Sequence, residues 1–204
     1  AMYHSALMAK DAFLEEHPDA MQIEVIDSNC YSVGYGYPIM QACQRALEGE
    51  SFEDVLAYIR DYLRRVRIYF SPFTLKYVKK SGRVSAAAAV VGDLLGIRPI
   101  ISLNAGVSKV ESKVRGDAAV PAAMIKWVES RVDSMKDTPY MVAYTSSTAK
   151  RDELVKLCKK AFGHAPLIVF QLGGVVSANT GPDGIAIVYE GKPRNLEAYA
   201  PELP

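Results

Sequence analysis

Hydrophobic positions recur at helical spacing along much of the chain, and short apolar runs stand between those segments. The helical spacing predicts helices over residues 3–16, 38–48, 51–66, 73–80, 86–95, 117–135 and 150–162. Runs rich in β-branched and aromatic residues predict strands over residues 23–26, 68–70, 97–103, 107–114, 141–144, 167–172 and 185–189. Helices that alternate with strands in this way are typical of an α/β fold.

Glycine and proline mark the connections between these elements. Gly49 and Gly163 are predicted to end the helices before them. Residues 104–106 form the turn of a predicted β-hairpin. Residues 173–184 are predicted to form a shaped loop that places Asn179 and Thr180, or alternatively a wide hairpin turn. Residues 193–204 are predicted to be a loose tail.

Polar residues follow the first predicted strand, where ligands of α/β sheets commonly bind. Asp27 and Ser28 stand at this position, although they also suit a plain loop or a helix cap. Gly34 and Gly36 then resemble the start of a dinucleotide-binding fingerprint. Ile39 stands where the third glycine belongs, so we do not predict NAD binding.

Arg83 lies in the turn that most favours a ligand site. Gly82 allows a sharp turn, and Ser85 is able to cap the helix that follows. An arginine beside a helix N-terminus suits a carboxylate or a phosphate. The alternative interpretation is a solvated arginine in a loop.

Composition narrows the classes of function. The chain has 204 residues, of which 50% are hydrophobic and 23% charged, so it can bury a sizeable core. The net charge of +1 gives no reason to expect nucleic acid as a partner. Cys30, Cys43 and Cys158 lack metal-site spacing and indicate free thiols in a reducing compartment. With no apolar run of transmembrane length, the sequence predicts a cytoplasmic protein.

The chemistry-bearing residues form no recognisable catalytic set. The sequence contains no Walker loop, HExxH motif, nucleophile elbow or paired Cys/His ligands, so we predict neither a metal nor a cofactor. The aliphatic composition with a few polar loops suits a small-molecule cleft. Arg60, Arg64, Arg65 and Arg67 form a basic cluster, which is either a solvated face or a contact for anionic lipid or an acidic protein.

The order and spacing of these motifs resemble the DegV family of fatty-acid-binding proteins across nearly the whole chain. The matching residues are 25–28, Ser32 with Gly34 and Gly36, 69–70, Leu75, Val78, 79–85, 94–100, 113–116 and 179–182. The resemblance implies two α/β lobes, which we place at residues 1–72 and 73–192, with a mixed or antiparallel sheet and helices in the second lobe. It further implies that a long-chain fatty acid lies between the lobes, and that its carboxylate is presented to a separate fatty-acid kinase subunit that makes an acyl phosphate for phospholipid synthesis. The binding protein itself is then not an enzyme.

The resemblance also assigns the ligand-binding residues, with two departures from the family pattern. Arg83 matches the family arginine near the carboxylate, and Thr180, Asp27 and Ser28 complete the predicted site. Asn179 stands where the family usually has a histidine, and Asp183 where a glycine is usual. Residues 3–6 resemble the stretch that follows the family's serine- and glycine-rich loop. We therefore expect the first lobe to be incomplete, lacking its N-terminal part.

Two other classes of function stay open on the sequence alone. One is a divergent enzyme or binding protein for another small anionic ligand, with Asp27, Ser28 and Arg83 in its site. The other is a regulatory module whose basic helix, residues 60–67, docks a partner.

Overall fold

The computed structural model describes residues 2–81, 96–104 and 107–193. The helices are α1 (Met2–Glu16), α2 (Val33–Leu47), α3 (Phe52–Arg65), α4 (Lys76–Ser81), the 3₁₀ turn η3 (Asp117–Ala119), α5 (Val120–Glu129), α6 (Thr148–Phe162) and α7 (Gly174–Thr180). The strands are β1 (Val66–Ser71), β2 (Ile97–Asn104), β3 (Val107–Arg115), β4 (Tyr140–Tyr144), β5 (Val169–Gln171) and β6 (Ile185–Glu190). The prediction of a mixed α/β fold is confirmed.

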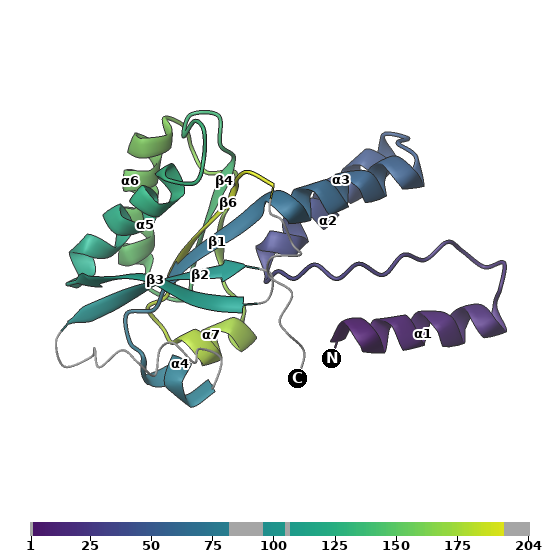
Figure 1. The fold of residues 1–204 in the computed structure, drawn as a ribbon, viewed down its shortest axis with the longest axis horizontal. Coiled ribbons are helices and arrows are strands. Elements are labelled where there is room, and N and C mark those ends of the chain that lie inside the picture. Colours follow the sequence, from purple (N-terminus) through teal and green to yellow (C-terminus); the bar gives the residue numbers. More distant parts are fainter. Residues whose placement is uncertain (1, 82–95, 105–106, 194–204) are drawn as a thin grey trace.

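The six strands form one sheet in the order β3-β2-β1-β6-β4-β5. All neighbours are antiparallel except β4 and β5, which are parallel. The predicted hairpin is confirmed, because β2 and β3 pair from Ile97 with Arg115 to Asn104 with Val107. Strand β6, the last in the described part of the chain, lies between β1 and β4 at the centre of the sheet (Figure 1).

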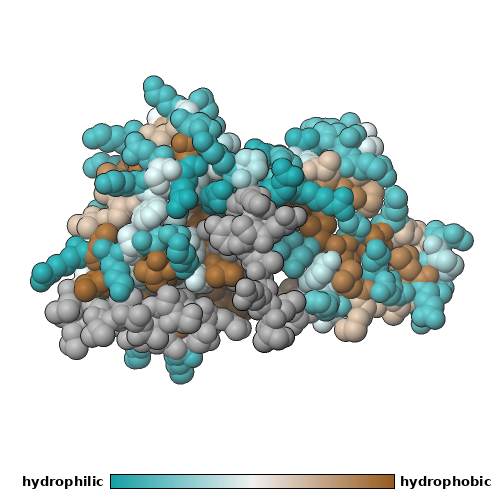
Figure 2. All heavy atoms as spheres, in the orientation of Figure 1, coloured by the Kyte–Doolittle hydropathy of each residue, from teal (hydrophilic) through white to brown (hydrophobic). Residues whose placement is uncertain are grey.

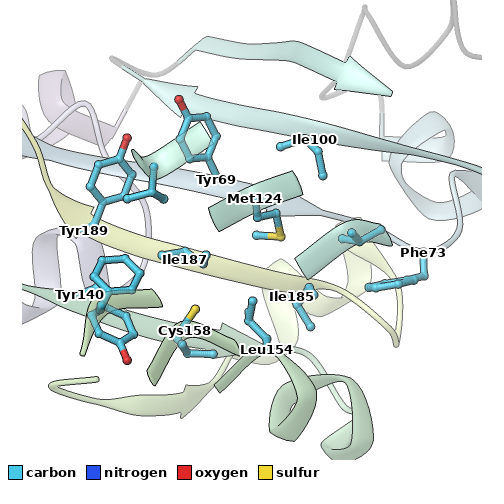
Figure 3. Packing of buried hydrophobic residues seen from close by; sticks show 14 residues of the cluster. Tyr69, Phe73, Ile100, Met124, Tyr140, Leu154, Cys158, Ile185, Ile187 and Tyr189 are labelled. Atoms are coloured by element: carbon cyan, nitrogen blue, oxygen red, sulfur yellow. The ribbon is translucent and has the colours of Figure 1, made fainter. Parts of the chain in front are cut away.

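One face of the sheet packs against α5 and α6 (Figure 1). Met124 and Val128 of α5, and Leu154 and Phe162 of α6, are completely buried there. Figure 3 shows the aromatic and aliphatic side chains of this layer. Cys158 lies among them, and burial raises the pKa of its thiol to about 12, so it is a protonated core residue at neutral pH. All three cysteines are free, as predicted.

The other face of the sheet packs in part against α2 and α3. Ile59 and Leu63 of α3 join a second apolar cluster with Ile68 of β1. Gly34 of α2 approaches the sheet so closely that an added Cβ would collide with Cys30 Sγ and lie 3.3 Å from Ile68 Cδ1. Gly34 therefore permits a close approach of α2 to the sheet, whereas nothing lies within 4 Å of the corresponding position on Gly36.

The N-terminal helix contributes no buried residue. Figure 1 shows α1 apart from the sheet and joined to α2 by an extended stretch. Met8, Phe13, Tyr35, Ile39 and Met40 are exposed on α1 and α2, and hydrophobic surface is visible around these helices in Figure 2. The N-terminal helices thus bury much less apolar surface than α5 and α6.

Several predicted elements differ from the structure. The strand predicted at residues 23–26 is wrong, since this run belongs to the extended stretch and no strand of the described sheet pairs with it. Helix α2 begins at Val33 rather than residue 38, so Pro38 and both glycines lie inside it. Helix α5 ends at Glu129, short of the predicted residue 135, and Ser130 Oγ donates to the carbonyl of Trp127 there (2.8 Å). The predicted turn at Gly82 and helix at 86–95 lie outside the described residues.

Candidate functional site

The carboxyl ends of β1 and β4, together with α4 and α7, build the candidate site at one edge of the sheet. Helices α4 and α7 contact each other there and lie side by side in Figure 1. The expectation that residues 173–184 form a loop or wide hairpin is wrong. Residues 174–180 are the helix α7, and β5 and β6 are separated by β4 in the sheet.

Hydrogen bonds from the end of β4 fix the segment that follows α7. The amide of Gly184 donates to Thr145 Oγ1 (2.8 Å), and the amide of Thr145 donates back to the carbonyl of Gly184 (2.9 Å). The amide and hydroxyl of Ser146 both donate to the carbonyl of Pro182. Thr145 is buried, so its two bonds to Gly184 hold the segment against the sheet with little competition from water, whereas Ser146 is exposed.

We expect Thr145→Val to destabilise the fold by about 1–3 kcal/mol, because it leaves the buried amide of Gly184 without an acceptor. Urea unfolding followed by circular dichroism measures the change. Thr145→Ser keeps the hydroxyl and serves as the matched control. A Thr145→Val variant as stable as the unsubstituted protein, with the loss confined to Thr145→Ser, would show that the methyl group matters and the hydrogen bond does not.

Glycine is required at the end of α7 because the helix meets α4 there. Gly181 has a φ of +90°, a conformation that side-chain-bearing residues rarely adopt. A Cβ at this position would lie 2.7 Å from Tyr77 Cδ2 and 3.3 Å from Thr74 Cγ2. The close contact places the last residues of α7 directly beside α4.

Asn179 and Thr180 are the two predicted site residues that the structure places together, in the last turn of α7. Both side chains bond to their own helix, since Asn179 Nδ2 donates to the carbonyl of Val175 (2.7 Å) and Thr180 Oγ1 donates to that of Val176 (2.9 Å). Asparagine has a second N–H that can still donate to a ligand. The Thr180 hydroxyl uses its only hydrogen in this bond, so in this rotamer it can accept a hydrogen bond from a ligand but cannot donate one.

An apolar row of the sheet leads to this edge. Cross-strand pairs align five side chains of the second cluster, in the order Ile101, Phe70, Ala186, Ala143 and Phe170. The two alanines have short side chains, so the row is lowest between the rings of Phe70 and Phe170 that flank them. The row reaches the α7 segment, because a Cβ on Gly184 would lie 2.8 Å from Phe70 Cε2. An apolar surface therefore ends at a polar edge.

Asp27 and Ser28 lie in the stretch before α2 and act as local caps. Asp27 Oδ1 accepts from the amide of Asn29 (3.1 Å), and Ser28 Oγ accepts from that of Cys30 (3.3 Å). Among the described residues no hydrogen bond joins them to Asn179 or Thr180. Arg83 lies outside the described residues.

The basic cluster of α3 and β1 is largely engaged within the protein. Arg60 pairs with Glu24, and Arg65 pairs with Glu190 (3.0 Å). Burial raises the pKa of Glu190, an effect that Arg65 partly offsets. Arg67 Nη2 donates to the carbonyl of Lys192 (2.8 Å). These contacts favour an internal role over an open basic face.

Two of the motifs behind the family resemblance meet in the hairpin. Arg98 of β2 pairs with Val114 of β3, and the amide of Gly116 donates to the carbonyl of Gly96 (2.8 Å). Asp117 accepts from Arg98 Nε (2.8 Å) and from Lys150 Nζ (2.7 Å). Partial burial opposes ionisation of Asp117, but these two hydrogen bonds outweigh it and hold its pKa below the ordinary value. These contacts have a structural role, because they join the hairpin to α6.

Sequence reasoning missed how the site is anchored. The available signal was the polar run 145–148 at the carboxyl end of a buried strand. Residues 2–81, 96–104 and 107–193 contain no cluster of His, Cys, Asp or Glu placed to hold a metal ion. Within the same ranges no helix has the length and apolarity needed to cross a bilayer.

Comparison with known proteins gives a consistent match. A family model described as "Uncharacterised protein, DegV family COG1307" matches residues 1–192. A DegV domain-containing protein of Clostridium acetobutylicum is 29% identical over 187 residues, which is 92% of this chain and 65% of that protein. The chain thus spans about two thirds of the length of this curated relative.

Solved structures share the fold. A DegV family protein from Eubacterium eligens, loaded with heptadecanoic acid, superposes with a TM-score of 0.81 at 27% identity, covering 93% of this chain and 68% of that one. A stearic acid-binding protein from Eubacterium ventriosum gives a TM-score of 0.79 at 25% identity, covering 96% of this chain and 67% of that one.

Proposed function

Because this chain belongs to the DegV family, we propose that it binds a long-chain fatty acid, with the carboxylate at the α4–α7 edge and the acyl chain along the apolar row of the sheet. The observation that carries the proposal is the shared fold with the Eubacterium eligens protein loaded with heptadecanoic acid. The binding of stearic acid by the Eubacterium ventriosum relative supports the same class of ligand.

The arrangement of side chains supports this assignment. An acyl chain needs a continuous apolar lining, and the row from Ile101 to Phe170 is apolar throughout, with four of its five side chains buried in the core. A carboxylate needs donors at one end of that surface. Asn179 offers one N–H, Thr180 offers a hydroxyl after a change of rotamer, and Arg83 is proposed to supply the charged donor.

We further propose that the protein is a binding subunit and not an enzyme, and that it presents the carboxylate to a separate fatty-acid kinase for acyl phosphate formation. Four further expectations stay predictions. They are phospholipid synthesis as the destination of the acyl phosphate, a cytoplasmic location, the division into lobes at residue 72 and the lack of an N-terminal segment. A transient contact with anionic membrane also stays a prediction, and the pairing of Arg60 and Arg65 gives it no support. Roles for Asp27 and Ser28 at the carboxylate also stay predictions.

Native mass spectrometry of the full-length protein tests the proposal. We expect a stoichiometric adduct that organic extraction identifies as a long-chain fatty acid. Protein stripped of lipid should take up stearate at a ratio of one to one. A stripped protein that takes up no fatty acid would contradict the proposal and favour another small anionic ligand.

We expect Asn179→His to tighten stearate binding by about 3- to 10-fold at a pH where the new histidine is protonated, since a charged donor makes a stronger hydrogen bond to a carboxylate than an amide does. Fluorescence competition against a labelled fatty acid measures the affinity. Asn179→Ala is the matched comparison and should weaken binding by only about 3-fold. Tighter binding should disappear above the pKa of the histidine. Unchanged affinity across pH would mean that residue 179 does not touch the carboxylate.

A further inference from the structure

A second polar site lies on the opposite face of the sheet, near the start of β1. It is a cavity of about 100 Å³. That volume is too small for a long acyl chain but suits a compact oxyanion. Its polar walls come from Arg67, Tyr69, Ser102, Lys109, Glu111 and Arg131.

Positive charge exceeds negative charge in these walls. Arg67, Lys109 and Arg131 face one carboxylate, that of Glu111. This carboxylate is already engaged, because its Oε1 accepts from Ser102 Oγ (2.8 Å) and its Oε2 pairs with Lys109 Nζ (3.4 Å). Within the described ranges neither Arg67 nor Arg131 forms an ion pair with a carboxylate.

Arg67 is held in place. Its Nη2 donates to the carbonyl of Lys192 (2.8 Å), and its side chain lies against Gly191, where an added Cβ would come within 2.8 Å of Nε. The Nε atom is buried and has no hydrogen-bond partner in the part of the chain that the structure describes. This atom lies against Gly191 and is closed to solvent, so Arg67 contributes its charge to the cavity rather than this N–H.

The opposite wall is also fixed. The guanidinium of Arg131 lies 5.7 Å from the ring centre of Trp127, and Trp127 Nε1 donates to Ser112 Oγ (2.8 Å). The register of β2 and β3 shifts at this point, where Ile100 pairs with Ser112 but Ile101 pairs with Val110, and Glu111 is the extra residue of the bulge. Bulges of this kind redirect side chains and are common beside binding sites.

Tyr69 is the tyrosine that lines the cavity. Tyr69 and Tyr189 stack with ring centres 5.9 Å apart, and their hydroxyls point the same way, away from Met124 and Ile185 (Figure 3). A hydroxyl can donate to an oxyanion beside two guanidinium groups. Arginine recognises planar pairs of oxygens on phosphate or carboxylate with two parallel hydrogen bonds.

We propose that this cavity binds a phosphate-type oxyanion, supplied either as free phosphate or as the phosphate of a lipid headgroup. The site is independent of the proposed fatty-acid site, because Tyr69 faces the α5 side of the sheet and Phe70 faces the other. Loss of one ligand should therefore leave binding of the other intact.

Calorimetric titration of the full chain with inorganic phosphate, at constant ionic strength in chloride, tests the first source. We expect saturable binding that Arg131→Gln weakens by about 10-fold. Glu111→Gln should tighten it by about 3-fold, since it removes the one negative charge and keeps an acceptor for Ser102. Arg60→Gln, at an arginine paired with Glu24 and absent from the cavity walls, is the control and should change nothing.

Sedimentation with phosphatidylcholine vesicles, with and without phosphatidic acid, tests the second source. Binding that requires phosphatidic acid and is lost in Arg131→Gln would identify a headgroup, even if free phosphate fails to bind. Two results would overturn the proposal. One is that neither phosphate nor phosphatidic acid vesicles bind. The other is that both substitutions leave every measured affinity as it is in the unsubstituted protein.

Discussion

Replacing Arg83 with alanine is expected to weaken stearate binding by about 10- to 100-fold, the largest effect on affinity that we predict. A charged donor to a carboxylate contributes about 1.5–3 kcal/mol, and the remaining candidates here are neutral. Asn179 has one N–H to offer, and Thr180 donates to its own helix. If Arg83 is the only charged donor, no neighbour can compensate for its loss. Titration of lipid-stripped protein with stearate measures the change.

Arg60→Ala is the matched control for this measurement. Arg60 carries the same charge but pairs with Glu24 on the N-terminal side of the molecule, so its loss should leave the affinity within about 2-fold. A methyl ester of stearate, which lacks the charge, should bind wild type and Arg83→Ala equally. An Arg83→Ala variant that binds stearate as tightly as wild type would remove Arg83 from the site and favour a solvated arginine.

Replacing Phe162 with alanine is expected to lower the free energy of unfolding by about 3–5 kcal/mol. Phe162 closes α6 and is completely buried. Its ring stacks on Tyr140 with ring centres 3.9 Å apart, and the Tyr140 hydroxyl donates to the carbonyl of His164 (2.9 Å). The substitution therefore opens a cavity and loosens the aromatic pair beneath the C-terminal cap of α6. Urea unfolding gives the free energy.

Phe52→Ala provides the comparison, since Phe52 begins α3 and is 39% exposed. We expect it to cost about 1 kcal/mol or less. Domains of ordinary stability unfold at about 5–15 kcal/mol, so Phe162→Ala should leave a protein that is folded but easily denatured. Similar losses in the two variants would mean that α6 packs more loosely than its complete burial implies.

The sequence predicted the elements whose signals are local. The helix predicted from residue 51 is confirmed as α3, which buries Ile59 and Leu63 and is capped by Ser51, whose Oγ accepts from the amide of Asp54 (3.1 Å). The glycine stop at Gly163 and the hairpin of β2 and β3 are confirmed too. In each case the signal lies within a few residues, where propensity and turn chemistry act directly.

The predictions that failed concern segments whose structure depends on contacts with residues far away in the sequence. Residues 23–26 have strand composition, yet a strand also requires a partner, and composition does not report one. Residues 174–180 contain β-branched residues beside a glycine pair, which indicates a loop. They form α7 because the segment is fixed at both ends, by Ser177 Oγ donating to the carbonyl of Leu172 and by the packing of Gly181 on α4. The site combines β4, α4 and α7, whose meeting depends on the sheet order.

The position of β6 has a consequence for how the protein is made. Synthesis proceeds from the N-terminus, and β1 leaves the ribosome before β6, yet β6, the last strand of the described residues, is its partner on one side, with Ser71 opposite Ile185. Until β6 emerges, no strand pairs with both β1 and β4, so the sheet of the nascent chain stays incomplete. Closing the long loop between β1 and β6 is slow, so we expect the docking of β6 to limit the rate of refolding. We also expect chaperones to bind the incomplete chain during synthesis.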